Sequence, residues 1–190
     1  MELREYRKED AEIICSWIEN EKSLYQWSAD RLGRFPVSGD DLNRNYEPAL
    51  ASGCFFPLTA VESSDRVAGH LIIRYPDAAD RTRVRFGFVI IDPVLRGRGK
   101  GREMLETALD YARDVLKADT VTLGVFANNP AARRCYESAG FRSVGENTFY
   151  QMPEGRWECI EMERTLLKCS NGEEGKTAGS GFSTMKEACP

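Results

Sequence analysis

The most regular alternation of hydrophobic and polar positions lies in the second half of the chain, between Met104 and Leu116. Apolar residues recur there at spacings of one, three and four positions, and charged residues such as Glu106 and Arg113 lie between them. This periodicity predicts an amphipathic helix with one buried face. The apolar positions are Met104, Leu105, Ala108, Leu109, Ala112, Val115 and Leu116.

Strand patterns lie on both sides of this helix. Residues 81–92 alternate between apolar and polar side chains, and they become apolar on both faces from Phe88 to Ile91, as in a central strand covered on both sides. Residues 120–126 predict the next strand, and a strand, helix, strand succession predicts a parallel pair joined by a right-handed crossover. The side chains expected on one face of the first strand are Val84, Phe86, Phe88 and Ile90.

Shorter patterns predict the rest of the sheet and its first helices. Asp10 is expected to cap a helix that runs to about Asn20, and residues 40–50 predict a helix capped by Ser38 or Asp40. Hairpins that lead into a strand covered on both faces predict a mixed sheet in an α/β fold. Further strands are expected at 1–6, 55–61, 66–74, 143–150 and 156–167.

Two other regions carry distinct signals. Residues 21–53 are irregular, polar and aromatic, which fits either a wall that binds a ligand or a variable loop. Further on, Asn128 and Asn129 precede Pro130, which predicts the capped start of a short helix, and Gly140 marks its end.

Composition is that of a globular protein with one domain. Of the 190 residues, 42% are hydrophobic and 29% charged, and the net charge of -4 disfavours nucleic acid as a partner. Residues 1–168 are expected to form the domain, and residues 169–190 a flexible tail. No apolar run is long enough for a membrane span or the core of a signal peptide, so a cytoplasmic protein without a membrane partner is expected. The six cysteines form no CxxC pair and His70 is the only histidine, so no metal site is expected.

Candidate chemistry is concentrated in the turn before the long helix, RGRGKGR at residues 96–102. A glycine-rich turn at a helix N-terminus presents backbone N–H groups to an anion, and the basic side chains add positive charge, so the expected ligand carries phosphate. A P-loop requires Ser or Thr after Lys100, and a dinucleotide-binding fingerprint requires GxGxxG, whereas Gly97, Gly99 and Gly101 alternate here. The remaining alternative is a turn that only joins a strand to a helix.

The pattern R-x-x-G-x-G that begins at Arg96, with Asn129 and Tyr136 downstream, resembles the GNAT superfamily of acyl-CoA-dependent N-acyltransferases. The resemblance is strongest over residues 84–141 and extends more loosely over residues 1–167, and it is similar to the branch that contains ribosomal-protein and small-amine acetyltransferases. It implies a twisted mixed sheet with helices on both faces, in which two central parallel strands splay apart to admit acetyl-CoA.

The resemblance also implies roles for the matching residues. Asn129 would contact acetyl-CoA near its pantetheine, although it also fits a helix cap. Tyr136 would direct its hydroxyl at the thioester sulfur and act as the catalytic acid, although it also fits a core aromatic. Strand residues would bind the pantetheine through their backbone, and the turn would bind the pyrophosphate. The expected cofactor-binding residues are Val89, Ile90, Ile91, Arg96, Gly97, Arg98, Gly99, Lys100, Gly101, Arg102, Asn129 and Tyr136.

Direct transfer also needs a proton acceptor, because an ammonium has no lone pair with which to attack the thioester. Relatives that acylate protein N-termini often place a carboxylate at the position of Gly124, where this chain has none. His70 is a catalytic candidate because imidazole titrates near neutral pH, although a lone strand histidine is more often a satisfied part of the fold. A carboxylate that acts through water, such as Glu146 or Glu161, is an equal alternative.

These signals together predict an N-acetyltransferase that moves the acetyl group of acetyl-CoA directly to a primary amine. The acceptor would be a protein N-terminus or a small molecule, and its identity would depend on residues 21–53. No acyl-enzyme is expected, because no cysteine lies beside the glycine turn with a base partner. The protein is expected to be a monomer or homodimer. The alternative is an acyl-CoA-binding regulatory or sensor domain without turnover.

Overall fold

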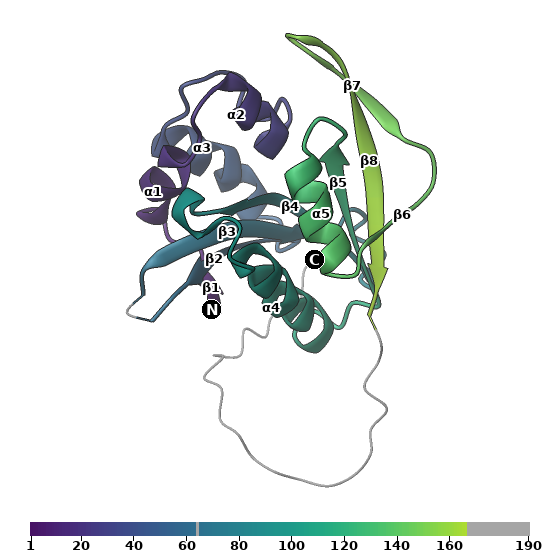
Figure 1. The fold of residues 1–190 in the computed structure, drawn as a ribbon. Helices are drawn as coiled ribbons and strands as arrows, with labels where there is room; N and C mark the ends of the chain where they lie inside the picture. Colours follow the sequence, from purple (N-terminus) through teal and green to yellow (C-terminus); the bar gives the residue numbers. More distant parts are fainter. Residues whose placement is uncertain (64, 167–190) are drawn as a thin grey trace, which may run out of the picture.

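One mixed sheet of eight strands runs through residues 1–63 and 65–166, which a computed structural model describes (Figure 1). The strand order is β1-β2-β3-β4-β5-β8-β6, and β7 pairs with β8. Among the described strands, only β4 and β5 pair in parallel, so the predicted mixed sheet is confirmed. The strands are β1 (Glu2–Glu5), β2 (Phe55–Val61), β3 (Val67–Arg74), β4 (Arg83–Ile91), β5 (Thr120–Phe126), β6 (Arg142–Ser143), β7 (Thr148–Met152) and β8 (Gly155–Thr165).

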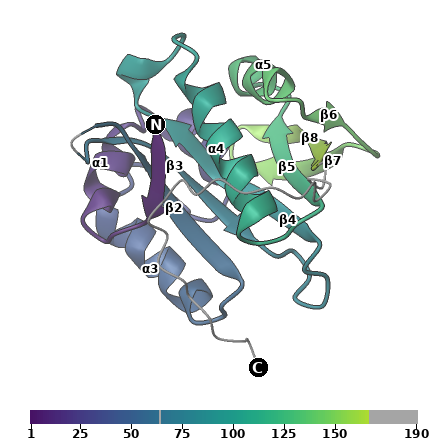
Figure 2. The same ribbon diagram turned by 90° about the horizontal axis from the view of Figure 1, so that it is seen from below.

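Helices cover both faces of this sheet, as the two perpendicular views show (Figures 1 and 2). The three N-terminal helices lie on one face, and the two later helices lie on the other. A short 3-10 helix, Pro93–Leu95, follows β4. The expected tail at 169–190 lies outside the described residues, so the division into a domain and a tail stays a prediction. The α-helices are α1 (Asp10–Ser16), α2 (Glu21–Ser28), α3 (Gly39–Leu50), α4 (Lys100–Asp114) and α5 (Pro130–Ser138).

Each face of the sheet has its own core. Beneath α4 and α5, the buried side chains include Phe86, Leu105 and Leu123. Beneath α1 and α3, they include Leu42 and Tyr46. A third cluster joins α2 to β5 and to the hairpin of β7 and β8, and it consists of Tyr25, Ala29, Phe126, Met152, Trp157 and Cys159. The third cluster fixes α2 across the end of β5.

The side-chain alternation predicted for β4 is wrong beyond Phe86. Phe88 has a φ of +50°, and the pairing with β3 steps by two residues, from Ile72 to His70, while β4 advances by three. This extra residue is a β-bulge, and it moves every later side chain to the opposite face. Val84 and Phe86 therefore lie in the core beneath α4, whereas Phe88 and Ile90 lie in the core beneath α1 and α3.

The two parallel strands separate soon after they pair. Their register contains Arg83 with Thr120, Val84 with Val121, and Arg85 with Thr122, and no later pair. Beyond Arg85, no described strand pairs with the side of β4 that faces β5. The predicted splay is confirmed.

Three local expectations need correction. Asp10 is the first residue of α1 and not its N-cap, which is Glu9, and the helix ends at Ser16 and not near Asn20. Residues 21–28 form α2, a helix that was not predicted, and Asn20 and Ser23 form a capping box at its start. The expected strand at 143–150 is divided into β6 and β7, with Gly145 between them at a φ of +66°, a backbone conformation that interrupts a strand.

Candidate active site

The glycine turn leads directly into the first residue of α4. Gly97 and Gly99 have φ values of +74° and +77°, in the left-handed region that favours glycine. A Cβ at either position would meet nothing within 4 Å, so the need for glycine comes from the backbone conformation. Gly99 is the N-cap of α4 and supplies no side-chain bond. The first N–H groups of this 15-residue helix therefore face outward beside a basic turn, as at an anion site.

The four cations of the turn differ in their partners. Lys100 Nζ donates to Glu103 Oε2 at 2.8 Å, and Arg102 Nε donates to Glu106 Oε1 at 2.7 Å. The Arg96 guanidinium is 3.8 Å from the Glu19 carboxylate, and both groups are about half exposed. Arg98 is exposed and has no ion pair within the described residues. Arg98 is therefore the cation of the turn with its full bonding capacity available.

Gly101 has a packing role. A Cβ built there would lie 3.1 Å from Cys135 Sγ, so the absence of a side chain lets α5 approach the first turn of α4. Asn129 begins α5, and its Oδ1 accepts a bond from the Ala132 N–H at 3.2 Å. The predicted cap is confirmed, and the proposed cofactor contact of Asn129 remains a prediction. The close approach of the two helices positions Tyr136, which follows Cys135.

The position of Tyr136 is compatible with both interpretations of this residue, a core aromatic and a catalytic acid. Its side chain is buried in the core beneath α4 and α5, and its ring lies edge-on to that of Phe141 at 6.2 Å between centroids. Burial, with a smaller contribution from Cys135, raises the pKa of its hydroxyl well above the ordinary value. The phenol therefore keeps its proton at neutral and moderately alkaline pH, as a proton donor must.

His70 lies on the other face of the sheet, beneath α3. Its ring is fully buried, and Nε2 lies 2.8 Å from the hydroxyl oxygen of Tyr46. Burial lowers the pKa of His70 to about 3, so the ring is neutral at physiological pH. With no exposure to solvent, it has no path by which to release a proton that it accepts, and we assign it no step in the reaction.

A carboxylate from β8 occupies the space beside Gly124. Gly124 lies opposite Glu161 in the antiparallel pairing of β5 with β8. A Cβ at Gly124 would lie 2.8 Å from Arg85 Nη2 and 3.4 Å from Glu161 Oε1. Arg85 donates to both oxygens of Glu161, at 2.6 and 3.1 Å. From the sequence, Glu161 is one of two candidate carboxylates, because its position beside Gly124 depends on strand register. The second candidate, Glu146, is exposed between β6 and β7.

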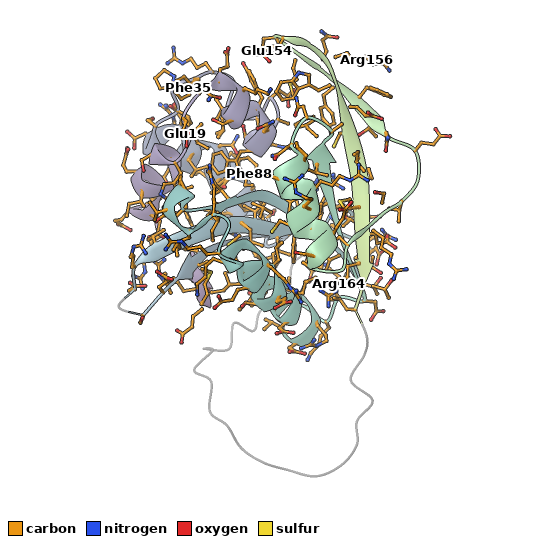
Figure 3. The ribbon with its side chains drawn as sticks, in the orientation of Figure 1. Glu19, Phe35, Phe88, Glu154, Arg156 and Arg164 are labelled. Carbon is orange, nitrogen blue, oxygen red and sulfur yellow. The ribbon has the colours of Figure 1, made fainter. Side chains whose placement is uncertain are left out.

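The unpredicted helix α2 forms a wall over the diverging strands. Trp27 lies edge-on to Phe88, with 5.1 Å between ring centroids. Figure 3 shows Phe88 in the middle of the molecule, where β4 passes beneath α2. Gln26 Nε2 donates to the backbone and side-chain oxygens of Asn128 at 2.9 and 3.1 Å, which joins α2 to the loop after β5. This bridge supports the interpretation of residues 21–53 as a wall.

Three further observations describe the molecule around this site. Across residues 1–63 and 65–166, no cluster of three or more His, Cys, Asp or Glu side chains is arranged to hold a metal ion. Over the same residues, no helix is both long and apolar enough to span a membrane. Shallow surface hollows beside α3, lined by residues such as Lys8, Asn43 and Glu47, lie on the opposite side of the sheet from the glycine turn.

Comparisons with known proteins match this arrangement. The model of the acetyltransferase (GNAT) family matches residues 17–141. An N-alpha-acetyltransferase RimI from Mycobacterium tuberculosis is 40% identical over 65 residues, which are 34% of this chain and 39% of that protein. A mycothiol acetyltransferase from Beutenbergia cavernae is 37% identical over 81 residues, 43% of this chain and 26% of the other. The chain thus spans about a quarter to two fifths of the length of these two relatives.

A solved structure shows the same fold over most of the chain. Spermidine N-acetyltransferase from Vibrio cholerae, in complex with CoA and spermine, superposes with a TM-score of 0.70 at 21% identity and covers 86% of this chain and 94% of its own. The family match spans about two thirds of the sequence and contains β4, the glycine turn, α4, β5 and α5. The chain belongs to the GNAT acetyltransferase family.

Proposed function

We propose that this protein transfers the acetyl group of acetyl-CoA to a primary amine. The observation that carries the proposal is that β4 and β5 stop pairing at Arg85 and Thr122. Beyond that pair, the edge of β4 that faces β5 is unpaired as the strand leads towards the glycine turn, whose Gly97 and Gly99 are left-handed. The open backbone at Val89–Ile91 would bind the pantetheine arm. The turn and the N-terminus of α4 would bind the pyrophosphate.

Acetyl-CoA would supply an activated acyl group and a thiolate leaving group. The amine nitrogen forms the new C–N bond, and the C–S bond to CoA breaks. Tyr136 donates its phenolic proton to the departing sulfur, and burial keeps that proton in place beforehand. Glu161, held by Arg85 beside Gly124, would take the amine's proton through water.

The acceptor class follows from the relatives only in outline. The relatives include a spermine/spermidine N(1)-acetyltransferase from Bacillus subtilis, 30% identical over 79 residues, and the N-alpha-acetyltransferase of Mycobacterium tuberculosis. A small-molecule amine and a protein N-terminus are therefore the two acceptor classes to test. The enzyme would act as a monomer or homodimer.

The experiment is steady-state acetylation of an amine and peptide panel, measured by release of the CoA thiol. Arg98→Ala should raise the KM for acetyl-CoA about tenfold, since a hydrogen-bonded charge pair contributes roughly 1.5–3 kcal/mol. Arg133→Ala is the matched control, because Arg133 is an exposed arginine on α5 that pairs with Glu137 and lies outside the turn. Tight acetyl-CoA binding without turnover on any amine would favour the sensor alternative.

A further inference from the structure

Two arginines face each other across β3 and β4, and a carboxylate contacts only one of them. Arg74 is the direct register partner of Arg85. Like charges that lie directly opposite in a sheet are destabilising. Glu161 neutralises Arg85 through two hydrogen bonds, whereas Arg74 has no hydrogen bond or ion pair within the described residues. Arg74 is half-buried, so its unmatched charge has a cost that the fold alone does not explain.

A third arginine, Arg31, adds positive charge to the surroundings of Arg74. Arg31 follows α2, and its backbone oxygen accepts a bond from Asn45 Nδ2 at 3.1 Å, which fixes this turn against α3. Burial, followed by the charges of Arg85 and Arg31, lowers the pKa of Arg74, while Tyr150 and Glu161 act in the opposite direction. The facing pair Arg74 and Arg85 thus carries two positive charges, and Glu161 neutralises one of them.

The position of this arginine pair, Arg74 and Arg85, fits that of an acceptor beside the gap between β4 and β5. Arg85 belongs to the last parallel pair before the strands separate, and its guanidinium lies beside the bare Cα of Gly124. Tyr136 packs on the opposite face of the sheet, beneath α4 and α5. The donor and the acceptor would therefore approach the gap between β4 and β5 from opposite faces.

We propose that the acceptor is a small amine that also carries an anionic group, a carboxylate or a phosphate, which binds Arg74. This inference rests on the proposed function and narrows its substrate class. The anion would supply the counter-charge that Arg74 lacks. A polyamine would bring only further positive charge to the same place, and the polyamine complex of the Vibrio cholerae protein shares the fold alone.

The test compares amines that differ only in the anion. β-Alanine is set against β-alaninamide, phosphoethanolamine against ethanolamine, and spermidine serves as the cationic reference. The two pairs separate a carboxylate from a phosphate. In at least one pair, the anionic amine should have a kcat/KM about ten- to a hundredfold above that of the amine without the anion, as expected for a charge-assisted hydrogen bond. Spermidine should be acetylated more slowly than the preferred anionic amine.

Variants assign the preference to Arg74. Arg74→Gln should reduce the preference to below about threefold, and Arg74→Lys should restore part of it. Arg83→Gln is the control, because Arg83 lies two residues from Arg85 on β4 and pairs with Glu163 at 2.6 Å. Since Arg74 has no partner among the described residues, its removal should leave the apo protein at least as stable by thermal unfolding.

Failure of this inference is distinguishable from failure of the proposed function. Preferred turnover of spermidine or of the uncharged amines would overturn the anionic acceptor and leave acetyl transfer standing. If no amine is acetylated, calorimetric titration of the same pairs of amines into the CoA-loaded protein tests the anionic acceptor by binding alone. Anion-dependent binding lost in Arg74→Gln would support the inference without the enzyme, and the absence of such binding would overturn it.

Discussion

Replacement of Tyr136 by phenylalanine removes one oxygen atom from the centre of the proposed reaction. The ring is 7% exposed and packs edge-on against Phe141, and its hydroxyl makes no hydrogen bond within the described residues. The variant keeps this packing, so the free energy of unfolding should change by less than about 1 kcal/mol. Loss of a general acid should lower kcat by roughly 10²–10⁴-fold, or about 3–5 kcal/mol in the barrier.

The assay is single-turnover acetylation at saturating acetyl-CoA, with the dissociation constant of CoA measured separately by calorimetry. Tyr75→Phe is the control, because Tyr75 stacks with Arg81 at the far end of β3 and takes no part in the proposed reaction. Tyr136→Phe should bind CoA as the unchanged protein does. A kcat within about threefold of the unchanged protein, with folding intact, would refute the role of Tyr136 as the acid.

Three further predictions concern pH, folding and the glycine turn. Since burial raises the pKa of Tyr136, kcat/KM should rise as the amine loses its proton and should not fall again below about pH 9; a descending limb in the pH profile below that value would contradict this. Burial alone would raise the pKa of Asp10, but bonds from Arg4, the Arg7 backbone and Thr59 outweigh it and lower the pKa. The contribution of Asp10 to stability is therefore present above the unfolded-state pKa of about 3.9 and is lost as pH falls through the folded-state pKa. Asp10→Asn should cost about 3 kcal/mol in urea unfolding at pH 7 and much less near pH 3. An equal cost at both pH values would exclude this linkage. Gly99→Ala should cost about 1 kcal/mol in stability for its left-handed backbone and should raise the KM for acetyl-CoA. Gly33→Ala is the control, because Gly33 has a similar φ of +73° and an equally open Cβ position, and it should change stability alone. A KM that rises equally in both variants would show that the turn has no special role.

The elements that the sequence predicts well are those whose signals are local. The periodicity of α4, the asparagine and proline at the start of α5, and Ser38 at the start of α3 each act within a few residues. The capping box of Asn20 and Ser23 is a similar signal at the start of α2, but the mixed composition of the following residues hides the helix. Its apolar face becomes evident only when Tyr25 meets the β7 and β8 hairpin.

The features that escaped prediction depend on strand register. The bulge at Phe88 arises in the pairing of β4 with β3, and the apolar run from Phe88 to Ile91 does not indicate which of its side chains lies on which face. The carboxylate beside Gly124 comes from Glu161, 37 positions later in the chain, through the pairing of β5 with β8. The same is true of Arg74 opposite Arg85. The residues of the proposed donor site thus come from one continuous stretch of sequence, whereas those of the proposed acceptor site come from several strands.

The most direct test of acetyl transfer is the stoichiometry of the products. The protein is incubated with acetyl-CoA labelled in its acetyl group and with the amine panel, and mass spectrometry and thiol titration are read together. The account predicts one N-acetylated amine for each CoA released, at a rate well above that without amine. Release of CoA without an acetylated amine, or no release despite tight binding of acetyl-CoA, would contradict it.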